Sequence, residues 1–460
     1  MAHFNVLVIG SGPGGYVAAI RAQQLGLSAA CVEMAELGGV CLNWGCIPSK
    51  AILKSAEYAN LVAHLGDYGI SVDGEISVDV PKIIKRSRRV AKKSEKGVKY
   101  LFKKYGVTQL TGRGTLLGGA KVQVANGDDI QEHSADHIIV ATGARARWFD
   151  GMEPDGEKIL TYREAIVSDH KPASVVVLGS GAIGLEFAYF YNAMGAQVTI
   201  VEGQDRLAPL EDAECSEELG RAYRKLGINV LTGQFCKSVE RKGEGCVTTL
   251  ADGSTIETEQ VLLALGVRAN VEDIGLETAG VRTERGFIVT DADCKTSADG
   301  VYAIGDVAGP PMLAHKASAE AHICVERIAG HHVPDLDADM IPAGTFCQPQ
   351  IASVGRTEQQ LKEAGVAFKV GRFPFAANGK NRGTGYTDGF VKVLVAESDG
   401  ELLGCHIIGQ DATELLSEVV MAMSGELDAQ TFLHAVHSHP TSSEAVMEAV
   451  ADALGVCVHI

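Results

Sequence analysis

The run Val6-Leu-Val-Ile-Gly10-Ser-Gly12-Pro-Gly-Gly15 is the strongest indication of the fold of this chain. Its apolar residues predict a buried strand that runs directly into glycines spaced G-x-G-x-x-G. A helical sequence follows up to Gly26, and a second apolar run ends on Glu33. The first glycine permits a tight turn, the second lets the backbone approach a pyrophosphate, and the third lets helix and strand pack closely. The stretch therefore predicts a strand–helix–strand unit whose helix N-terminus binds a dinucleotide.

The same unit occurs a second time, as Val175-Val-Val-Leu-Gly179-Ser-Gly181-Ala-Ile-Gly184 with Glu202 at its end. In both copies a helix-ending glycine stands 16 residues, and the glutamate 23 residues, after the first glycine. A single G-x-G-x-x-G is a weak signal, but two full units at identical spacing predict two dinucleotide sites. Glu202 would bind ribose hydroxyls and repel a 2′-phosphate, and only Arg206 follows closely. NAD is therefore favoured over NADP at the second unit.

Length and composition narrow the class of protein. A chain of 460 residues exceeds one ordinary core, so two to four domains are expected. The net charge of −17 argues against binding to nucleic acid or to an anionic membrane, and no apolar run reaches the length of a membrane span. We expect no secretory signal before the first strand, and the 11 cysteines are odd in number and scattered. We expect a cytoplasmic protein.

A pair of cysteines, Cys41 and Cys46, follows the first unit in the run from Leu37 to Lys50. The spacing lets the sulfurs come within disulfide distance across one irregular helical turn. We expect the helix to begin near Cys41 and to continue through Lys54, with a distortion at Pro48. A redox-active disulfide is favoured over a structural disulfide or a zinc site, because no further Cys or His ligands lie nearby. A helix N-terminus and Lys50 would stabilise a thiolate here.

Further motifs follow in a fixed order: Ala141-Thr-Gly143, Tyr302-Ala-Ile-Gly-Asp306, Leu313-Ala-His-Lys-Ala317 and His437-Ser-His-Pro-Thr-Ser-Ser-Glu444. With these motifs nearly the whole chain resembles the flavin-dependent disulfide reductases of the class I pyridine nucleotide-disulfide oxidoreductase family, and within them the dihydrolipoamide dehydrogenases. The resemblance implies an α/β fold with two Rossmann-like dinucleotide-binding domains and an α+β interface domain. The expected domains are an FAD domain (1–145 and 270–335), an NAD domain (146–269) and an interface domain for a homodimer (336–460).

The resemblance also assigns the cofactor sites, with FAD at the first unit and NAD at the second. The residues expected at FAD are Gly10, Gly12, Gly14, Gly15, Glu33, Lys50, Gly114, Thr142, Gly143, Asp306, Ala314 and His315. The residues expected at NAD are Gly179, Gly181, Gly184, Glu186, Glu202 and Gly266. No metal site is expected.

The two sulfurs have different roles in the family pattern. Cys41 would exchange with the substrate, whereas Cys46 would face the flavin as a thiolate. Lys50 would lie near the reactive flavin nitrogen, balanced by Glu186. For Glu186 an alternative remains, because an acid in the first turn of a helix is favourable anyway.

His439 is the candidate base, since a neutral imidazole is suited to taking protons from thiols near pH 7. Pro440 biases His439 away from helical geometry and is expected to open the next helix. Glu444 could orient the imidazole and stabilise its charged form. Alone, Thr441–Glu444 would indicate a capping box with His439 as a surface residue. The resemblance implies that this dyad comes from the opposite subunit, and for His437 support of the site and no role are equally open.

The expected activity is oxidation of a protein-bound dihydrolipoyl group with reduction of NAD⁺, and the expected partner is a lipoylated carrier protein. Another flavin disulfide reductase, of the glutathione or low-molecular-weight type, and a non-catalytic redox-sensing flavoprotein remain alternatives. The arginine of Leu265–Asn270 is shifted by one to Arg268, and His-Pro-Thr-Ser-Ser-Glu is closer to the glutathione-reductase form. Trp44 and Glu202 favour lipoamide and NAD. Residues 82–104 carry 11 basic side chains and one acid, which indicates a helix with a solvated face or a surface for an acidic lipoyl domain.

Overall fold

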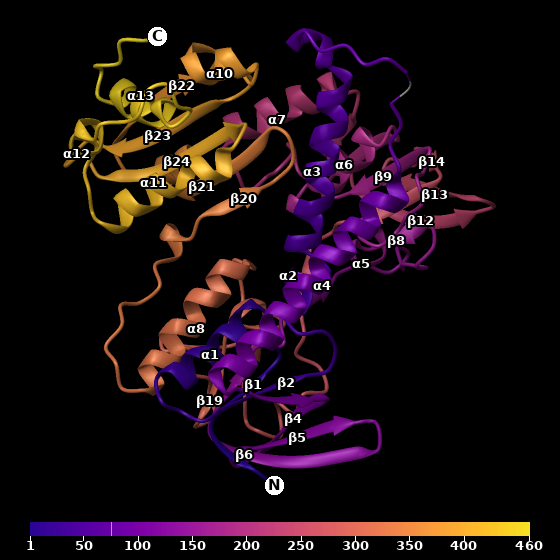
Figure 1. Ribbon diagram of the computed structural model, residues 1–460, viewed down its shortest axis with the longest axis vertical. Helices are drawn as coiled ribbons and strands as arrows, with labels where there is room; N and C mark the ends of the chain where they lie inside the picture. Colours follow the sequence, from indigo (N-terminus) through magenta and orange to yellow (C-terminus); the bar gives the residue numbers. More distant parts are fainter. Residues whose placement is uncertain (75) are drawn as a thin grey trace.

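The computed structural model describes residues 1–74 and 76–460, which form three regions, each with its own sheet (Figure 1). The first sheet has seven strands, and its parallel part is built around the predicted first unit. Its parallel strands are β1 (His3–Ile9), β2 (Ala29–Glu33), β3 (Thr108–Thr111), β6 (Asp129–Val140) and β19 (Val301–Ala303). The antiparallel strands β4 (Arg113–Gly118) and β5 (Lys121–Asn126) extend it.

Two helices distant in sequence lie side by side on the first sheet (Figure 1). They are α1 (Pro13–Gln24) and α8 (Ala314–Ile328), and their alanines Ala18, Ala22 and Ala321 are fully buried between them and the sheet. Strand β19 and the 3₁₀ turn η2 (Gly305–Ala308) precede α8. The chain therefore leaves the first sheet, builds the second region, and returns to the first.

The second region repeats the pattern around the predicted second unit. Its five parallel strands are β11 (Asn229–Thr232), β10 (Gln197–Glu202), β9 (Ser174–Leu178), β15 (Gln260–Leu263) and β8 (Ile159–Leu160), in that spatial order. The helices are α5 (Tyr162–Ala165), α6 (Ala182–Ala193) and α7 (Ala213–Lys225). An antiparallel ribbon of β12 (Cys236–Lys242), β13 (Gly245–Leu250) and β14 (Thr255–Thr258) packs beside it, and β7 (Ala144–Ala146) pairs with β16 (Val267–Ala269). A short hairpin, β17 (Thr283–Glu284) with β18 (Phe287–Ile288), follows.

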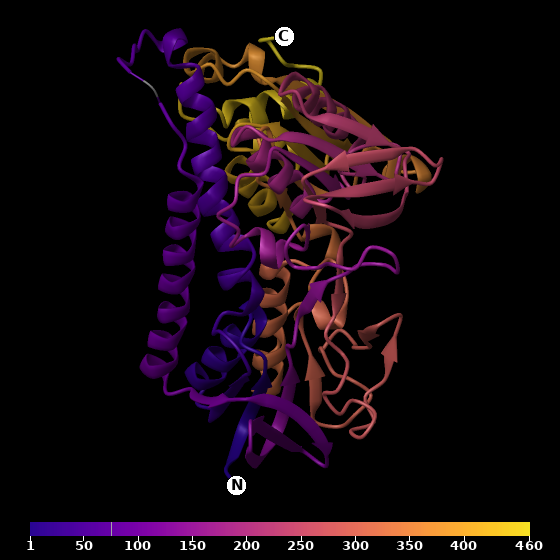
Figure 2. The ribbon, with the colours of Figure 1, turned by 90° about the vertical axis from the view of Figure 1, so that its right-hand side faces the viewer.

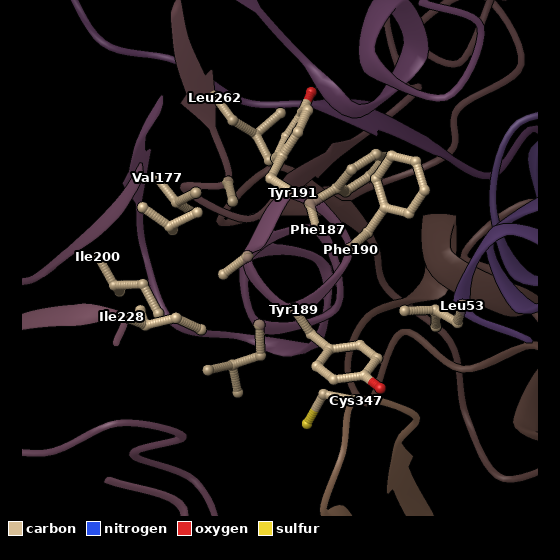
Figure 3. Close-up of a cluster of buried hydrophobic side chains, with 14 of the residues drawn as sticks. Leu53, Val177, Phe187, Tyr189, Phe190, Tyr191, Ile200, Ile228, Leu262 and Cys347 are labelled. Carbon is tan, nitrogen blue, oxygen red and sulfur yellow. The ribbon is translucent and has the colours of Figure 1, made fainter. Parts of the chain in front are cut away.

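Helix α6 is apolar on every side because it lies in the centre of the molecule. Figure 3 shows its aromatic side chains spreading outward, with Tyr189 pointing toward Cys347 of the third region. Another side of the helix faces Val177 and Ile200 of its own sheet, and Leu53 approaches from the neighbouring helix α3 (Cys46–Ala63). Packing among the three regions therefore fixes the position of Glu186, the acidic residue of α6.

Two long helices, α3 and α4 (Val80–Tyr105), run alongside each other down one side of the molecule (Figure 2). Between them lies the 3₁₀ turn η1 (Leu65–Tyr68). The basic helix predicted over 82–104 is confirmed, and Ile84, Val98 and Phe102 form its buried stripe. Asp79 caps its N-terminus by accepting a hydrogen bond from the Lys82 N–H at 2.9 Å.

The prediction of one helix starting near Cys41 is wrong. A short helix, α2 (Gly39–Asn43), ends before Trp44, and α3 begins afresh at Cys46. The break lies at Gly45, whose φ of −134° and ψ of −112° are not helical. Pro48 lies in the first turn of α3, where its missing N–H has no helical partner to lose, so it causes no distortion.

The third region is an antiparallel sheet in the order β20 (Ala343–Thr345), β21 (Gln350–Gly355), β24 (Leu402–Gly409), β23 (Phe390–Ala396) and β22 (Phe368–Pro374). Its main helices are α11 (Ala412–Ser424), which packs on β21 and β24, and α13 (Glu444–Ala453), which packs on β22 and β23. Shorter helices are η3 (Ala338–Met340), α9 (Glu358–Glu363), η4 (Phe375–Ala377), α10 (Gly379–Thr384) and α12 (Ala429–His434). Helix α13 starts at Glu444 rather than at Pro440 as expected, so residues 440–443 precede the helix. Among the helices of the described residues, none has the length and apolar character needed to cross a membrane.

A buried lysine joins the third region to the second. The side chain of Lys392 is 1% exposed, and its Nζ lies 3.0 Å from Asp212 Oδ1, 2.7 Å from Glu214 Oε1 and 2.5 Å from Glu358 Oε2. Burial alone would lower the pKa of Lys392, but hydrogen bonds to the three carboxylates raise it above its usual value. The lysine is therefore charged, and it compensates the charge of the buried Asp212 carboxylate.

Replacing Lys392 by Met is expected to lower the free energy of unfolding by ~3 kcal/mol, because the buried Asp212 carboxylate loses its lysine partner. The matched control is Lys242→Met, which removes the exposed pair with Glu257 and should cost less than ~1 kcal/mol. Denaturant unfolding of both variants measures the difference. Equal losses would contradict the importance of the junction.

Candidate active site

The two glycine turns have nearly the same backbone. Gly10 has φ of +100° and Gly179 has φ of +99°, a conformation that favours glycine. A Cβ on Gly10 would lie 2.3 Å from the Ala141 carbonyl oxygen, and one on Gly179 would lie 2.4 Å from that of Ala264. In each turn, therefore, both the backbone angle and the neighbouring strand require glycine.

The other glycines of each motif have different surroundings. A Cβ on Gly15 or Gly184 would lie 1.9 or 2.1 Å from the carbonyl oxygen of the first glycine, so both serve close packing. By contrast, nothing lies within 4 Å of a Cβ built on Gly12 or Gly181. These two are the N-caps of α1 and α6, and no side chain caps either helix. The open N–H groups at both helix starts fit an anionic pyrophosphate.

The acids at the ends of β2 and β10 are held in matching ways. Glu33 Oε2 accepts hydrogen bonds from the Ser11 N–H at 2.9 Å and its hydroxyl at 2.6 Å. Glu202 Oε2 accepts the same pair from Ser180 at 2.8 and 2.7 Å. In both cases Oε1 accepts the N–H two residues after the glutamate. Each carboxylate is thus oriented beside its glycine turn, with acceptor capacity left for ribose hydroxyls.

A single continuous cavity of about 2310 Å³ joins both units and the cysteine pair. Its size exceeds the 300–1,000 Å³ of ordinary ligand pockets, which fits two dinucleotides. Most of the predicted cofactor residues line it: Gly10, Gly12, Gly14, Glu33, Lys50, Gly114, Thr142, Gly143, Asp306, Ala314 and His315 on the first side, and Gly179, Gly181, Glu186, Glu202 and Gly266 on the second. Gly15 and Gly184 lie behind the wall, where they allow the packing described above.

Cys41 lies in α2 and Cys46 is the first residue of α3, and both are free thiols on the cavity wall. The Cys41 thiol donates a hydrogen bond to Cys46. This bond lowers the pKa of Cys46 although burial opposes the effect, and Lys50 lowers the pKa further. The same bond, together with burial, raises the pKa of Cys41. The pair is therefore asymmetric, and the thiolate forms more readily on Cys46 than on Cys41.

No group of three or more His, Cys, Asp or Glu side chains is placed to hold a metal ion in the part of the chain that the structure describes. The cysteine pair thus has no set of metal ligands around it.

Lys50 and Glu186 meet between the cysteine pair and the second unit. Lys50 Nζ lies 2.8 and 3.0 Å from the two carboxylate oxygens of Glu186, whose side chain is 9% exposed. The Phe346 N–H donates to Glu186 at 3.1 Å, and Lys50 Nζ lies 4.1 Å from the centre of the Phe346 ring. Glu186 lies beyond the first turn of α6, so the helix-terminus alternative is wrong. The ion pair joins residues from all three regions.

Asp306 lies in η2, where burial raises its pKa although Lys316 opposes the shift. Lys316 and Glu320, a buried pair on α8 with a 2.8 Å contact, were missed from the sequence. Glu320 also accepts the Gly305 N–H at 2.7 Å and so holds the turn that carries Asp306. Their spacing of four residues in a helix was the available signal.

Two loop contacts complete the wall on this side. Thr142 Oγ1 donates to the Asn270 carbonyl at 2.8 Å. The shifted Arg268 lies over the Trp148 ring at 5.6 Å, and Arg145 makes the 2.6 Å hydrogen bond to Asn270 Oδ1. Arg145 was missed because its partner is distant in sequence.

His439 Nδ1 lies 2.9 Å from Glu444 Oε1, and the imidazole is 77% exposed. Slight burial opposes ionisation of Glu444, but hydrogen bonds from the Thr441 N–H and His439 lower its pKa. The ionised carboxylate accepts from Nδ1, which leaves Nε2 as a free base. No capping box forms, because Ser443 is the N-cap of α13 and its side chain makes no capping bond.

Within the described chain neither His439 nor Glu444 lines the cavity that holds the cysteines. His437 is buried beneath the dyad, with Nε2 3.0 Å from Glu418 Oε2. The segment that carries His439 is thus anchored to α11 on one side and exposes its base on the other.

Replacing Lys50 by Met is expected to raise the pKa of Cys46, because the thiolate loses a nearby cation. Each half-unit rise lowers the thiolate fraction below the midpoint about threefold. The measurement is the pH dependence of iodoacetamide alkylation of the reduced protein, resolved by peptide mass spectrometry. Lys54→Met is the control, since Lys54 lies one turn further along α3 and pairs with Glu57. Identical profiles for the two variants would contradict the assignment.

Comparison with known proteins identifies a family and similar full-length proteins. The family described as "Pyridine nucleotide-disulphide oxidoreductase" matches residues 4–321, and its dimerisation domain matches residues 341–450. The chain is 45% identical to a protein of Rhizobium etli and 48% identical to one of Chlorobaculum tepidum, both named dihydrolipoyl dehydrogenase. The first match covers 98% of each chain, and the second covers 98% of this chain and 97% of the relative. The crystal structure of LpdA from Mycobacterium tuberculosis is similar with a TM-score of 0.92 at 28% identity, over 98% of this chain and 99% of that one.

Proposed function

The chain belongs to the pyridine nucleotide-disulphide oxidoreductase family, and we propose that it is a dihydrolipoyl dehydrogenase. It oxidises protein-bound dihydrolipoyl groups and reduces NAD⁺. The observation that carries the proposal is the asymmetric Cys41–Cys46 pair on the wall of a cavity that two dinucleotide units share. The names and high identity of full-length relatives add the substrate class.

FAD and NAD fit the two halves of the cavity. The first half offers the open N-terminus of α1, the oriented Glu33 and the half-buried Asp306, and the second offers the open N-terminus of α6 and Glu202. FAD, when bound, supplies the exchange between the two electrons of a dithiol and the hydride of NADH. Lys50, fixed by Glu186, holds positive charge beside the pair.

The thiol chemistry uses the cysteines in sequence, starting from their disulfide. One lipoyl thiolate attacks Sγ of Cys41, which breaks the Cys41–Cys46 bond and leaves the electron pair on Cys46 as a thiolate. The second lipoyl sulfur then attacks the sulfur bound to Cys41, which closes the lipoyl disulfide and releases Cys41. His439 Nε2 takes the proton of the first attacking thiol and releases it to solvent, then takes the proton of the second thiol and passes it to the released Cys41 thiolate; in each step the Glu444 carboxylate stabilises the imidazolium. Two electrons thus end on the cysteine pair, with Cys41 as a thiol and Cys46 as a thiolate.

Two chains are needed for this chemistry, because His439 lies outside the cavity of its own chain. We assign residues 1–145 and 270–335 to the FAD domain, 146–269 to the NAD domain and 336–460 to the interface domain. The pairing of β19 with β6 supports the discontinuous first domain. A second copy of the chain would then place its His439 at Cys41. The partner is a lipoylated carrier protein, and cytoplasm is the proposed compartment, given the scattered, free cysteines among the described residues.

Steady-state assays separate this function from other disulfide reductases. Dihydrolipoamide with NAD⁺ should be turned over rapidly, whereas glutathione disulfide with NADPH should not. Glu202 supports the preference for NAD, since its carboxylate would repel a 2′-phosphate. Cys46→Ser should lose nearly all activity while keeping FAD. Turnover with glutathione disulfide and NADPH alone would overturn the proposal, and retained activity in Cys46→Ser would overturn the role of the pair.

Mixed dimers test whether the dyad acts across the subunit interface. Cys46→Ser and His439→Gln should each be nearly inactive, because His439→Gln removes the base and general-base loss costs about 10²–10⁴ in rate. Unfolding and refolding equal amounts together should restore about a quarter of the wild-type activity, because half of the dimers then hold one complete site. His434→Gln, on the neighbouring helix α12, is the control for a histidine outside the dyad. Mixed dimers with no recovered activity would place the dyad and the cysteines in one chain.

A further inference from the structure

The break between the two cysteines needs support from outside its own segment. Trp44 and Gly45 leave the helical path, and the Trp44 N–H donates back to the Val40 carbonyl at 2.7 Å. The position of Cys46 at the start of α3 therefore depends on the contacts that hold the turn at Trp44 and Gly45. Helices α2 and α4 pack together here, near the middle of the molecule (Figure 1), and Arg163 of α5 reaches the turn.

The basic helix α4 supplies the first part of that support. Its consecutive residues 86–88 each donate a hydrogen bond to a backbone carbonyl of the cysteine segment. Arg86 donates to Ala51 at 2.8 Å, Ser87 Oγ to Pro48 at 3.0 Å and Arg88 to Asn43 at 2.6 Å, where α2 ends. A side chain from α4 thus caps the last turn before the break.

Trp44 supplies the second part, because two guanidinium groups hold its ring. The Arg88 guanidinium carbon lies 4.8 Å and that of Arg163 lies 4.0 Å from the centre of the indole ring. The indole Nε1–H donates to Glu36 Oε2 at 3.2 Å. Cation–π contacts of this kind are favourable, and more so when partly desolvated, as for Arg88, whose pKa burial lowers. Arg88, Trp44 and Arg163 are called the tryptophan clamp below.

Through the clamp, part of the basic stretch 82–104 supports the cysteine turn and does not only form a solvated face. Arg88 is half-buried and turned toward α2, whereas its neighbour Arg89 is exposed. Arg163 comes from α5 of the second region and lines the cavity together with Trp44. The clamp therefore joins the cysteine turn to both dinucleotide units.

We propose that Arg88 and Arg163 are positioning residues that, through Trp44, keep Cys46 at the first position of α3 and within reach of the Cys41 thiol. The inference rests on the proposed redox function of the cysteine pair. Without the clamp the turn becomes mobile, and Cys46 no longer keeps both the helix N-terminus and Lys50 as its stabilising neighbours. Its thiolate then forms at higher pH.

Fluorescence tests whether the clamp holds Trp44. The chain has two tryptophans, so Trp148→Phe leaves Trp44 as the only reporter in the FAD-loaded protein. Acrylamide quenching of that emission should rise at least about twofold in Arg88→Met, because one face of the ring loses its cover. Arg89→Met, which removes the same charge from the next residue, should leave quenching unchanged. Equal quenching in the two variants would overturn the clamp.

Thiol titration tests the effect on Cys46. In a Cys41→Ser background, the pH midpoint for iodoacetamide alkylation of Cys46 should rise by about half a unit or more in Arg88→Met, which means about threefold slower labelling below the midpoint. Arg163→Met should shift it in the same direction, and Arg89→Met should not. Arg88→Lys, which keeps a cation and a donor, should recover part of the shift. A lower melting temperature with an unchanged midpoint would show a merely structural role and overturn the proposal.

These readouts keep the inference separate from the proposed function. If wild-type protein fails to oxidise dihydrolipoamide, the function is wrong whatever Arg88→Met does. If wild-type protein is active and Arg88→Met matches Arg89→Met in quenching and in alkylation midpoint, the function stands and the clamp is wrong.

Discussion

The ion pair between Lys50 and Glu186 is the interaction on which the arrangement of the site depends. It joins the helix that starts at Cys46 to the central helix of the second region, and the Phe346 N–H ties it to the third. A buried carboxylate needs a compensating charge, and this one has a lysine with two short contacts. The same lysine lowers the pKa of Cys46. One interaction therefore both joins the regions and polarises the thiol pair.

The molecule uses one dinucleotide unit twice, and the two copies agree down to the serine that follows the first glycine. Ser11 and Ser180 hold Glu33 and Glu202 with the same pair of hydrogen bonds. What differs is the segment that comes next. After the first copy the chain enters the cysteine turn, whereas after the second it enters α7, where Asp212 and Glu214 meet the buried Lys392. The two units bind in the same way, and the segments that follow them supply the residues that differ in function.

The errors in the sequence-based expectations have physical causes. The sequence pattern over Cys41–Lys54 is helical on both sides of Gly45, so it does not show that the helix breaks there. The break is stabilised by Arg88 of α4 and Arg163 of α5, which contact Trp44. Helix α13 starts at Glu444 and not at the expected Pro440, because the Glu444 carboxylate accepts hydrogen bonds from His439 and from the Thr441 N–H. In both places, side-chain contacts overrode a local rule.

The two strand–glycine–helix units, the cysteine pair and the histidine–glutamate dyad can be recognised from the amino-acid sequence alone. These depend on backbone freedom, spacing and side-chain type over a few neighbouring residues, which a sequence displays directly. The tertiary contacts add where the helix breaks, how burial and the neighbouring thiol separate the pKa values of Cys41 and Cys46, and that Lys316 with Glu320 supports Asp306. These features depend on burial and on partners from other elements, such as Glu186 opposite Lys50. A pKa value or a helix end is set by the groups that the fold brings near it, and these groups can be distant in sequence.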